Sequence, residues 1–331
     1  MVKPPGLSRS IRIVPPGTVA WGMQLPIQSQ STLYVSEWEK HASVDDMAAI
    51  AVAADAAGCF YLGVCDHTAI PARLVDAMGS VWYDTIATLG WLAGFTKRTR
   101  LLSHVVTLSQ RHPLRAAKEF STLDRLSHGR LVIGVGVGHV AEEFDVLNGP
   151  GSFAQRGKRG DEAIEALMQC LEAEAATHEG SCWSFSGMHI GPRAVQEPRP
   201  PVWIGGSSPA ALRRVAAYGD GWLPQGTPRS ALHEQIQRIR ELRREFRNDS
   251  WLDIGTIVEP MHIIESSRND PGWELPAGSL IGHAEQIAES LRGLVSMGVN
   301  HLQVRFRSRS TQECIEQIQC FAASVAPLLT V

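Results

Sequence analysis

The segment 98–147 constrains the fold of this chain more than any other part of the sequence. It reads RTRLLSHVVTLSQRHPLRAAKEFSTLDRLSHGRLVIGVGVGHVAEEFDVL: a strand, a loop, a helix, a tight turn at Gly129, a second strand and a glycine-spaced exit into another helix. Two consecutive βα units of this kind are typical of a parallel sheet covered by helices. The segment therefore predicts an α/β barrel or a doubly wound sheet, with its functional site at the carboxyl ends of the strands.

The alternation of strand-like and helical runs continues along the rest of the chain. Strands are predicted at 19–25, 59–65, 100–107, 131–135, 202–204, 221–223, 254–264 and 301–306, with Pro260 favouring a break in the seventh. Helices are predicted at 45–57, 84–95, 114–126, 155–174, 209–218, 230–246, 283–297 and 311–329, and long loops at 66–83 and 266–282. About eight βα units favour a closed (β/α)8 TIM barrel. An open doubly wound sheet is the alternative.

Two segments depart from this alternation. Residues 1–18 are polar and rich in proline and lack the apolar core of a secretory signal, so we expect a flexible extension or an arm that packs on the barrel. Residues 177–200 predict a β-hairpin insertion followed by an extended, proline-rich stretch. The barrel itself is therefore expected to span residues 19–331, with an insertion around 177–200.

Composition excludes several classes of function. The net charge of -3 provides no basic surface for nucleic acid. No apolar run approaches the roughly 18–20 residues that cross a membrane. The six cysteines contain no CxxC pair and predict reduced thiols in a cytoplasmic enzyme. Twelve histidines are present, but none has metal-ligand spacing at a predicted strand end, so no metal site is expected.

Polar residues at two predicted strand ends are candidates for proton transfer. Asp66 and His67 follow the second strand, and an imidazole can exchange a proton near neutral pH. The alternative is that Asp66 caps the following loop and His67 only packs. His139 follows the glycines at 134, 136 and 138, and it is a second candidate proton donor or a solvated loop residue. The glycines lack the GxGxxG spacing and predict room for a flat ring or close strand packing.

The segment Gly205-Gly206-Ser207-Ser208 connects a buried strand to a helix that begins at Pro209. Glycines let a ligand approach the backbone, and a helix N-terminus offers free N–H groups to an anion such as phosphate. A tight turn with a serine cap and no ligand is the alternative. The aromatic residues Trp82 and Tyr83, with the 177–200 hairpin, are candidates for the roof of an apolar substrate cavity or for plain core.

Two long strings of sequence are specific to a known family. VWYDTIATLGWLAGFTKRTRLLSHVVTLSQRHPLRAAKEFSTLDRLSHGRLVIGVGVGHVAEEF and RPPVWIGGSSPAALRRVAAYGDGWLP closely resemble the bacterial-luciferase-like superfamily, and within it the oxidoreductases that depend on the deazaflavin coenzyme F420. The resemblance covers roughly residues 19–330. It implies a (β/α)8 barrel that holds a flavin or deazaflavin at the strand ends.

The resemblance also implies roles for individual residues. Asp66 and His67 match the DH pair of the family, in which the histidine faces the redox ring. Ser103 and His104 match a bulge at which relatives carry a non-proline cis peptide behind the ring. The segment 205–208 matches the phosphate loop. The full set of residues expected to bind the cofactor is Asp66, His67, Ser103, His104, Val106, Gly136, Val137, Gly205, Gly206, Ser207 and Ser208.

One departure from the family pattern bears on the substrate. The sugar-phosphate dehydrogenase branch has a glutamate proton donor at the position of His139, which argues against sugar-phosphate oxidation here. The resemblance favours an F420-dependent oxidoreductase that moves a hydride between the deazaflavin C5 and a small organic substrate, with His67 and His139 as catalytic residues. The alternatives are an FMN-dependent monooxygenase served by a separate flavin reductase, and a non-catalytic flavin-binding barrel. By the same resemblance, we expect a homodimer.

Overall fold

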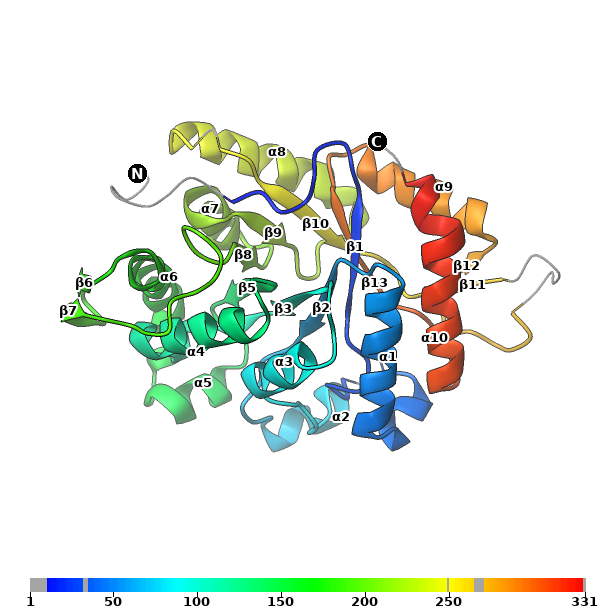
Figure 1. Ribbon diagram of the computed structural model, residues 1–331, viewed down its shortest axis with the longest axis horizontal. Coiled ribbons are helices and arrows are strands. Elements are labelled where there is room, and N and C mark those ends of the chain that lie inside the picture. Colours follow the sequence, from blue (N-terminus) through cyan, green and yellow to red (C-terminus); the bar gives the residue numbers. More distant parts are fainter. Residues whose placement is uncertain (1–10, 32–34, 249, 265–270, 330–331) are drawn as a thin grey trace.

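The computed structural model describes residues 11–31, 35–248, 250–264 and 271–329, and its centre is a closed barrel of eight parallel strands (Figure 1). The strands β2, β1, β13, β10, β9, β8 and β5 are neighbours in that order, and β3 pairs with both β2 and β5, which closes the barrel. Their bounds are β1 Ala20–Gln24, β2 Tyr61–Val64, β3 Arg100–Ser103, β5 Leu131–Gly136, β8 Val202–Gly205, β9 Gly221–Leu223, β10 Asp253–Ile257 and β13 His301–Val304. The predicted (β/α)8 barrel is confirmed, and the open sheet is wrong.

Helices surround the barrel on its outer side (Figure 1). The longer ones are α1 Val44–Ala56, α3 Thr85–Ala93, α4 Pro113–Leu126, α6 Arg156–Glu172, α7 Pro209–Tyr218, α8 Arg229–Glu245, α9 Ala284–Val295 and α10 Thr311–Cys320. Each lies within a few residues of a predicted helix. The short helix α5, Ala141–Asn148, follows β5 and has two acidic residues, Glu142 and Glu143, in its first turn.

Three segments differ from the prediction. The loop expected at 66–83 contains the short helix α2, Val75–Met78. The expected loop 266–282 ends in strand β12, Leu280–Gly282, which pairs with β11, Met261–Ile263; residues 265–270 lie outside the described part. Helix 311–329 is regular only to Cys320 and then passes through a π turn and a 3-10 turn. The two short segments were missed because three or four residues show no periodicity to read.

The predicted hairpin at 177–200 is present. Strands β6 Ala176–Glu179 and β7 Ser184–Met188 pair antiparallel and lie at the edge of the molecule beside α6 (Figure 1). The carboxylate of Glu162 in α6 accepts the backbone N–H groups of Cys182 and Trp183 at 2.8 Å each. The hairpin is therefore fixed to an outer helix.

Residues 11–18 are the described part of the expected N-terminal extension, and its first residues contact the amino ends of the barrel strands. The backbone N–H of Ile11 donates to Asp220, just before β9, at 2.8 Å. The N–H of Ile13 donates to Asp253, the first residue of β10, at 3.2 Å. Ile13 also packs against the hydrophobic cluster inside the barrel. This end of the barrel is thus covered by chain, and the opposite end carries the site.

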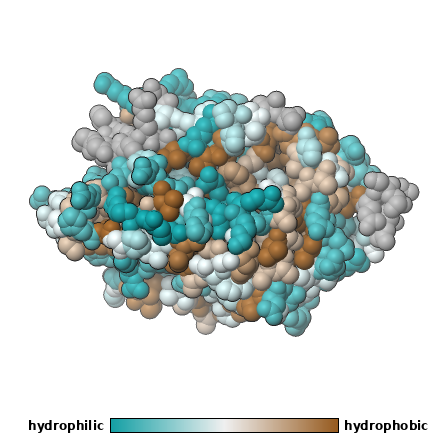
Figure 2. Space-filling model, viewed as in Figure 1, coloured by the Kyte–Doolittle hydropathy of each residue, from teal (hydrophilic) through white to brown (hydrophobic). Residues whose placement is uncertain are grey.

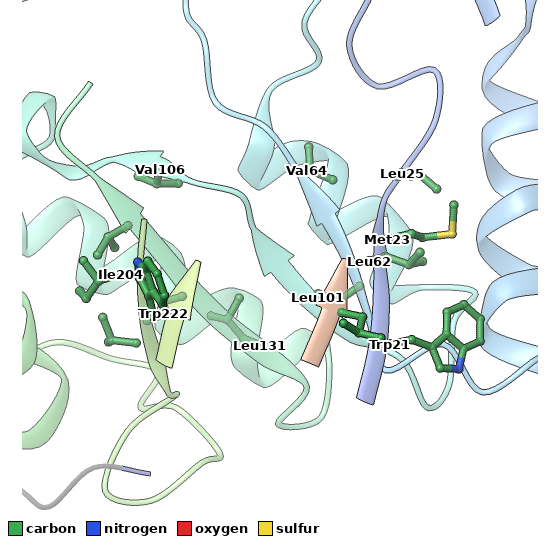
Figure 3. Packing of buried hydrophobic residues seen from close by; sticks show 14 of the residues in the cluster. Trp21, Met23, Leu25, Leu62, Val64, Leu101, Val106, Leu131, Ile204 and Trp222 are labelled. Atoms are coloured by element: carbon green, nitrogen blue, oxygen red, sulfur yellow. The ribbon is translucent and has the colours of Figure 1, made fainter. Parts of the chain in front are cut away.

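Buried side chains form two layers. The larger cluster lies between strands and helices; Figure 3 shows Trp21 and Met23 of β1, and Leu25 just after it, pointing to the same side of the strand. The smaller cluster lies inside the barrel and includes Tyr61 and Trp203. Alternating residues of a strand face opposite sides, so each strand serves both layers.

Glycines make room for the large rings inside the barrel. A Cβ atom at Gly22 would overlap Tyr61, one at Gly221 would overlap Trp203, and one at Gly255 would overlap the ring of His301. His301 is fully buried and stacks on Trp203 with ring centroids 4.2 Å apart. Large rings on some strands therefore occupy the space that glycines on neighbouring strands leave open.

On the face shown in Figure 2, hydrophilic residues surround small groups of hydrophobic ones. None of the helices in the described part of the chain is long and apolar enough to cross a membrane.

Candidate active site

Two histidines from different strand ends meet at the mouth of the barrel. His67 follows β2 and His139 follows β5, and their ring centroids are 5.2 Å apart with nearly perpendicular planes. The indole of Trp82 lies against the other side of His67 at 4.6 Å. The loop after β2 therefore folds back, so that Trp82 near its end contacts His67 near its start. The strand-end rule led to both histidines, and the structure brings them together.

Glu143 of α5 completes this group and was missed in the sequence. One carboxylate oxygen lies 2.9 Å from Nδ1 of His67. The other accepts the backbone N–H groups of Thr68 at 2.6 Å and Ala69 at 3.2 Å. Glu143 therefore binds three consecutive residues of the loop after β2 from a helix that follows β5. In the sequence, its only distinguishing feature is that it is a glutamate in the first turn of the helix that follows the glycines at 134, 136 and 138.

The charges of this group are coupled. Burial opposes ionisation of Glu143, but the hydrogen bond and charge of His67 and the two backbone N–H groups outweigh it and lower the pKa of Glu143. Partial burial lowers the pKa of His139, the neighbouring His67 lowers it further, and Glu143 acts in the opposite direction. The carboxylate is thus the ionised member, and His139 favours its neutral form.

Asp66 supports the loop and does not face the histidines. Its carboxylate accepts the backbone N–H of Thr107 at 2.9 Å, a guanidinium N–H of Arg111 at 3.0 Å and the hydroxyl of Thr85 at 3.1 Å. With these donors it ties the end of β2 to the end of the neighbouring strand. Asp66 therefore does not cap the following loop, whose backbone N–H groups of Thr68 and Ala69 donate to Glu143 instead.

The end of β3 is irregular, as the resemblance implies. The peptide bond between His104 and Val105 is cis, and the strand resumes as β4, Val106–Thr107, beside β5. The Ser103 hydroxyl donates to the carbonyl of Gly134 and accepts its N–H, both at 2.9 Å. Ser103 and Val106 are fully buried. Both residues are therefore part of the packed interior behind the mouth.

His104 points into the barrel. A Cβ atom at Gly63 of β2 would lie 3.2 Å from Cβ of His104, which places the imidazole over that glycine. The side chain is buried, and burial lowers its pKa to about 4. At neutral pH it is an uncharged group beneath the mouth.

Val105 lies between two predicted cofactor-binding glycines. A Cβ atom at Gly136 would come within 2.8 Å of its side chain, and one at Gly205 within 3.0 Å. Val105 itself is only partly buried. The side chain of Val137 turns instead toward α6, where a Cβ at Gly160 would overlap it. The two glycines thus leave space for Val105 at the floor of the mouth.

The segment after β8 has the form expected of an anion site. Gly206 adopts a positive φ of 102°, which favours glycine. The Ser208 hydroxyl caps α7 by accepting the N–H of Ala211, and the Ser207 hydroxyl donates to the carbonyl of Gln225 at 3.0 Å. In the described part of the chain, the backbone N–H groups of Ser207, Ser208 and Ala210 have no hydrogen-bonded acceptor. Free N–H groups at a helix N-terminus fit a phosphate.

The described residues contain no group of three or more histidine, cysteine or carboxylate side chains arranged to hold a metal ion. The candidate polar groups are His67, His139, Glu143 and the backbone N–H groups of Ser207, Ser208 and Ala210.

Comparison with known proteins assigns the family. Over 222 residues the chain is 30% identical to the uncharacterized protein Rv0940c of Mycobacterium tuberculosis (strain ATCC 25618 / H37Rv). The aligned region covers 63% of this chain and 75% of that protein. Two solved structures share the fold. One is an F420-dependent secondary alcohol dehydrogenase in complex with an F420-acetone adduct, with a TM-score of 0.74 at 16% identity, covering 95% of this chain and 100% of the other. The second is the oxygenating constituent of 3,6-diketocamphane monooxygenase from Pseudomonas putida in complex with FMN, with a TM-score of 0.72 at 14% identity, covering 94% and 98%. Residues 20–270 match the luciferase-like monooxygenase family, so this chain belongs to that family of oxidoreductases and monooxygenases.

Proposed function

We propose that this protein is an F420-dependent oxidoreductase that moves a hydride between the deazaflavin C5 and a small organic substrate. The observation that carries the proposal is the pair of imidazoles, His67 and His139, at the mouth of the barrel with ring centroids 5.2 Å apart. Oxidation of an alcohol releases a hydride from carbon and a proton from oxygen. A barrel mouth that offers an imidazole for the proton suits this chemistry.

The residues at the mouth fit a cofactor with a flat ring and a phosphate. The N–H groups of Ser207, Ser208 and Ala210 would bind the phosphate, and Val105 between Gly136 and Gly205 would lie beneath the ring. The bound deazaflavin would supply the hydride chemistry. In oxidation, His67 would accept the hydroxyl proton through Nε2 while His139 contributes a hydrogen bond. In reduction, the same ring returns the proton to the carbonyl oxygen.

The fold likeness to an F420-dependent alcohol dehydrogenase supports this choice. The likeness to an FMN-bound monooxygenase supports the second candidate, an FMN-dependent monooxygenase that receives reduced flavin from a separate reductase. Both candidates use the same phosphate segment and differ in their need for oxygen.

Titration of the purified protein with F420 and, separately, with FMN, followed by fluorescence quenching, tests the proposal. We expect micromolar binding of F420 and much weaker binding of FMN. The reverse preference would favour the monooxygenase. Binding of neither cofactor would overturn both candidates, and binding of F420 without turnover of any alcohol or carbonyl substrate would leave a non-catalytic barrel.

The variant His67→Gln tests the role of the imidazole. It should still bind F420 in the micromolar range, because the phosphate segment is untouched. Its turnover should fall by about 10²–10⁴-fold, the usual contribution of a general acid or base. Unchanged turnover would remove His67 from the mechanism.

A further inference from the structure

Glu143 is the buried charge of the site, and nothing in the strand-end rule accounts for it. It lies in the first turn of α5 with its side chain 8% exposed, and both of its oxygens are directed at the loop after β2. A buried carboxylate needs hydrogen bonds to remain charged. Three donors from His67, Thr68 and Ala69 supply them. Together they hold Glu143 in its ionised form, as its lowered pKa indicates.

An ionised carboxylate only accepts hydrogen bonds. The 2.9 Å contact with Glu143 therefore requires a proton on Nδ1 of His67. In the neutral imidazole, Nε2 then carries the lone pair. The neighbouring rings of Trp82 at 4.6 Å and His139 at 5.2 Å restrict rotation of His67 on its other sides.

We infer that Glu143 is the positioning residue of the site: it holds His67 in the Nδ1–H tautomer, so that Nε2 is free to accept a proton. The consequence for turnover rests on the proposed function, whereas the tautomer itself does not. Without this carboxylate, His67 would distribute between both tautomers, and in one of them Nε2 would carry a hydrogen and could not act as a base.

The adjacent Glu142 provides a matched control. It also reaches the loop after β2, where it pairs with Arg73 at 2.5 Å, but both side chains are largely exposed. Glu142→Gln removes one negative charge from the same turn of the same helix, and it leaves His67 untouched. A difference between Glu143→Gln and Glu142→Gln therefore reports contact with His67 and not the net charge of α5.

Nitrogen-15 NMR of the imidazoles, recorded without cofactor at a pH where histidines are neutral, tests the inference. The His67 signals are assigned by their loss in His67→Gln. In the wild type and in Glu142→Gln, we expect Nδ1 protonated and Nε2 bare. In Glu143→Gln, the amide can accept from or donate to Nδ1, so a mixture of tautomers is expected. A bare Nδ1 in the wild type overturns the inference, as does an unchanged tautomer in Glu143→Gln.

If Glu143→Gln fails to fold, the wild-type spectrum alone tests the tautomer of His67.

If Glu143→Gln folds, we expect its turnover to drop by about 10–10³-fold, a part of the general-base contribution, with little change in KM. The expected tautomer together with absent F420 turnover would contradict the proposed function and leave the role of Glu143 intact. The reverse result would contradict only the inference.

Discussion

A single methyl group at Gly136 should weaken cofactor binding through Val105. In Gly136→Ala the new Cβ would lie 2.8 Å from Cγ2 of Val105. Favourable carbon contacts begin near 3.5 Å, so the valine must move by about 0.7 Å. Toward β8 it can use only the space of the Cβ atom that Gly205 lacks, since a Cβ built there would lie 3.0 Å from the same side chain. Since Val105 is only partly buried, its remaining direction is into the mouth.

The magnitude follows from the cost of overpacking. An extra methyl in a closed core costs about 1–3 kcal/mol. Here the valine escapes toward the mouth in the free protein, so the stability loss should be near the lower end of that range. Cofactor binding must push the valine back. The binding free energy should therefore fall by about 1–3 kcal/mol, which corresponds to roughly 5- to 150-fold weaker binding of F420.

Fluorescence titration with F420, combined with urea unfolding, measures both effects. The double variant Gly136→Ala/Val105→Ala should recover most of the affinity, because the colliding methyl groups are gone. Gly90→Ala is the control: a Cβ there, in helix α3, meets no atom within 4 Å, so it should leave the affinity unchanged. Wild-type affinity in Gly136→Ala would refute the reasoning. So would weak binding that persists in the double variant.

Three further predictions concern the scaffold. Asp220→Asn should destabilise the protein by about 1–3 kcal/mol in urea unfolding, because the buried Arg199 loses the charge of the carboxylate 2.5 Å away and keeps its ion pair with Glu172 at 2.9 Å; an unchanged free energy of unfolding would contradict this. Gly255→Ala should lower the melting temperature, since its Cβ overlaps the trapped His301 ring, with a cost of about 1–3 kcal/mol or more; an unchanged melting temperature would show that the ring can move. Burial lowers the pKa of His104 to about 4 and that of His301 to about 3, whereas in the unfolded chain both histidines have the ordinary pKa of about 6.5. Below that pH the unfolded chain binds more protons than the folded one, so the stability falls as the pH drops below about 6.5. At pH 5 each histidine should cost about 2 kcal/mol relative to pH 7.5, and His301→Phe should remove its share of the acid loss; an equal acid loss in both proteins would count against the argument.

The ends of helices and strands were predictable where the local preferences of glycine and proline match the structure of the barrel. The helix before the fourth predicted strand ends at Leu126, and Gly129 has a φ of 78°, the left-handed conformation that favours glycine at such an ending. Pro260 separates β10 from β11, as its missing N–H suggests. Strand β12 was not predictable, because three residues have no readable period and its pairing with β11 exists only in the folded chain.

The site was predictable in part for the same reason. His67 and His139 each lie three residues after the end of a strand, β2 and β5, so barrel closure brings them to one rim. Glu143 lies on a helix, and acidic residues in a first turn are usual because they stabilise the helix N-terminus. Nothing local distinguishes it from Glu142, whose carboxylate faces a surface arginine. The contact with His67 depends on how the loop after β2 returns over α5, which is a property of the tertiary structure.

At Ser103 and Ser207, the role that the sequence predicts differs from the contacts that the structure shows. Ser103 is a predicted cofactor-binding residue by the family resemblance, and Ser207 is one as part of the predicted phosphate loop. In the structure, the Ser103 hydroxyl exchanges hydrogen bonds with the backbone of Gly134, and the Ser207 hydroxyl accepts from the N–H and donates to the carbonyl of Gln225. What remains for a phosphate is the backbone N–H row, whose direction is set by the positive φ of Gly206 and by the start of α7 at Pro209. In the proposed site, anion binding would therefore depend on the path of the chain, and the hydrogen bonds of the Ser207 and Ser208 hydroxyls would keep that path in place.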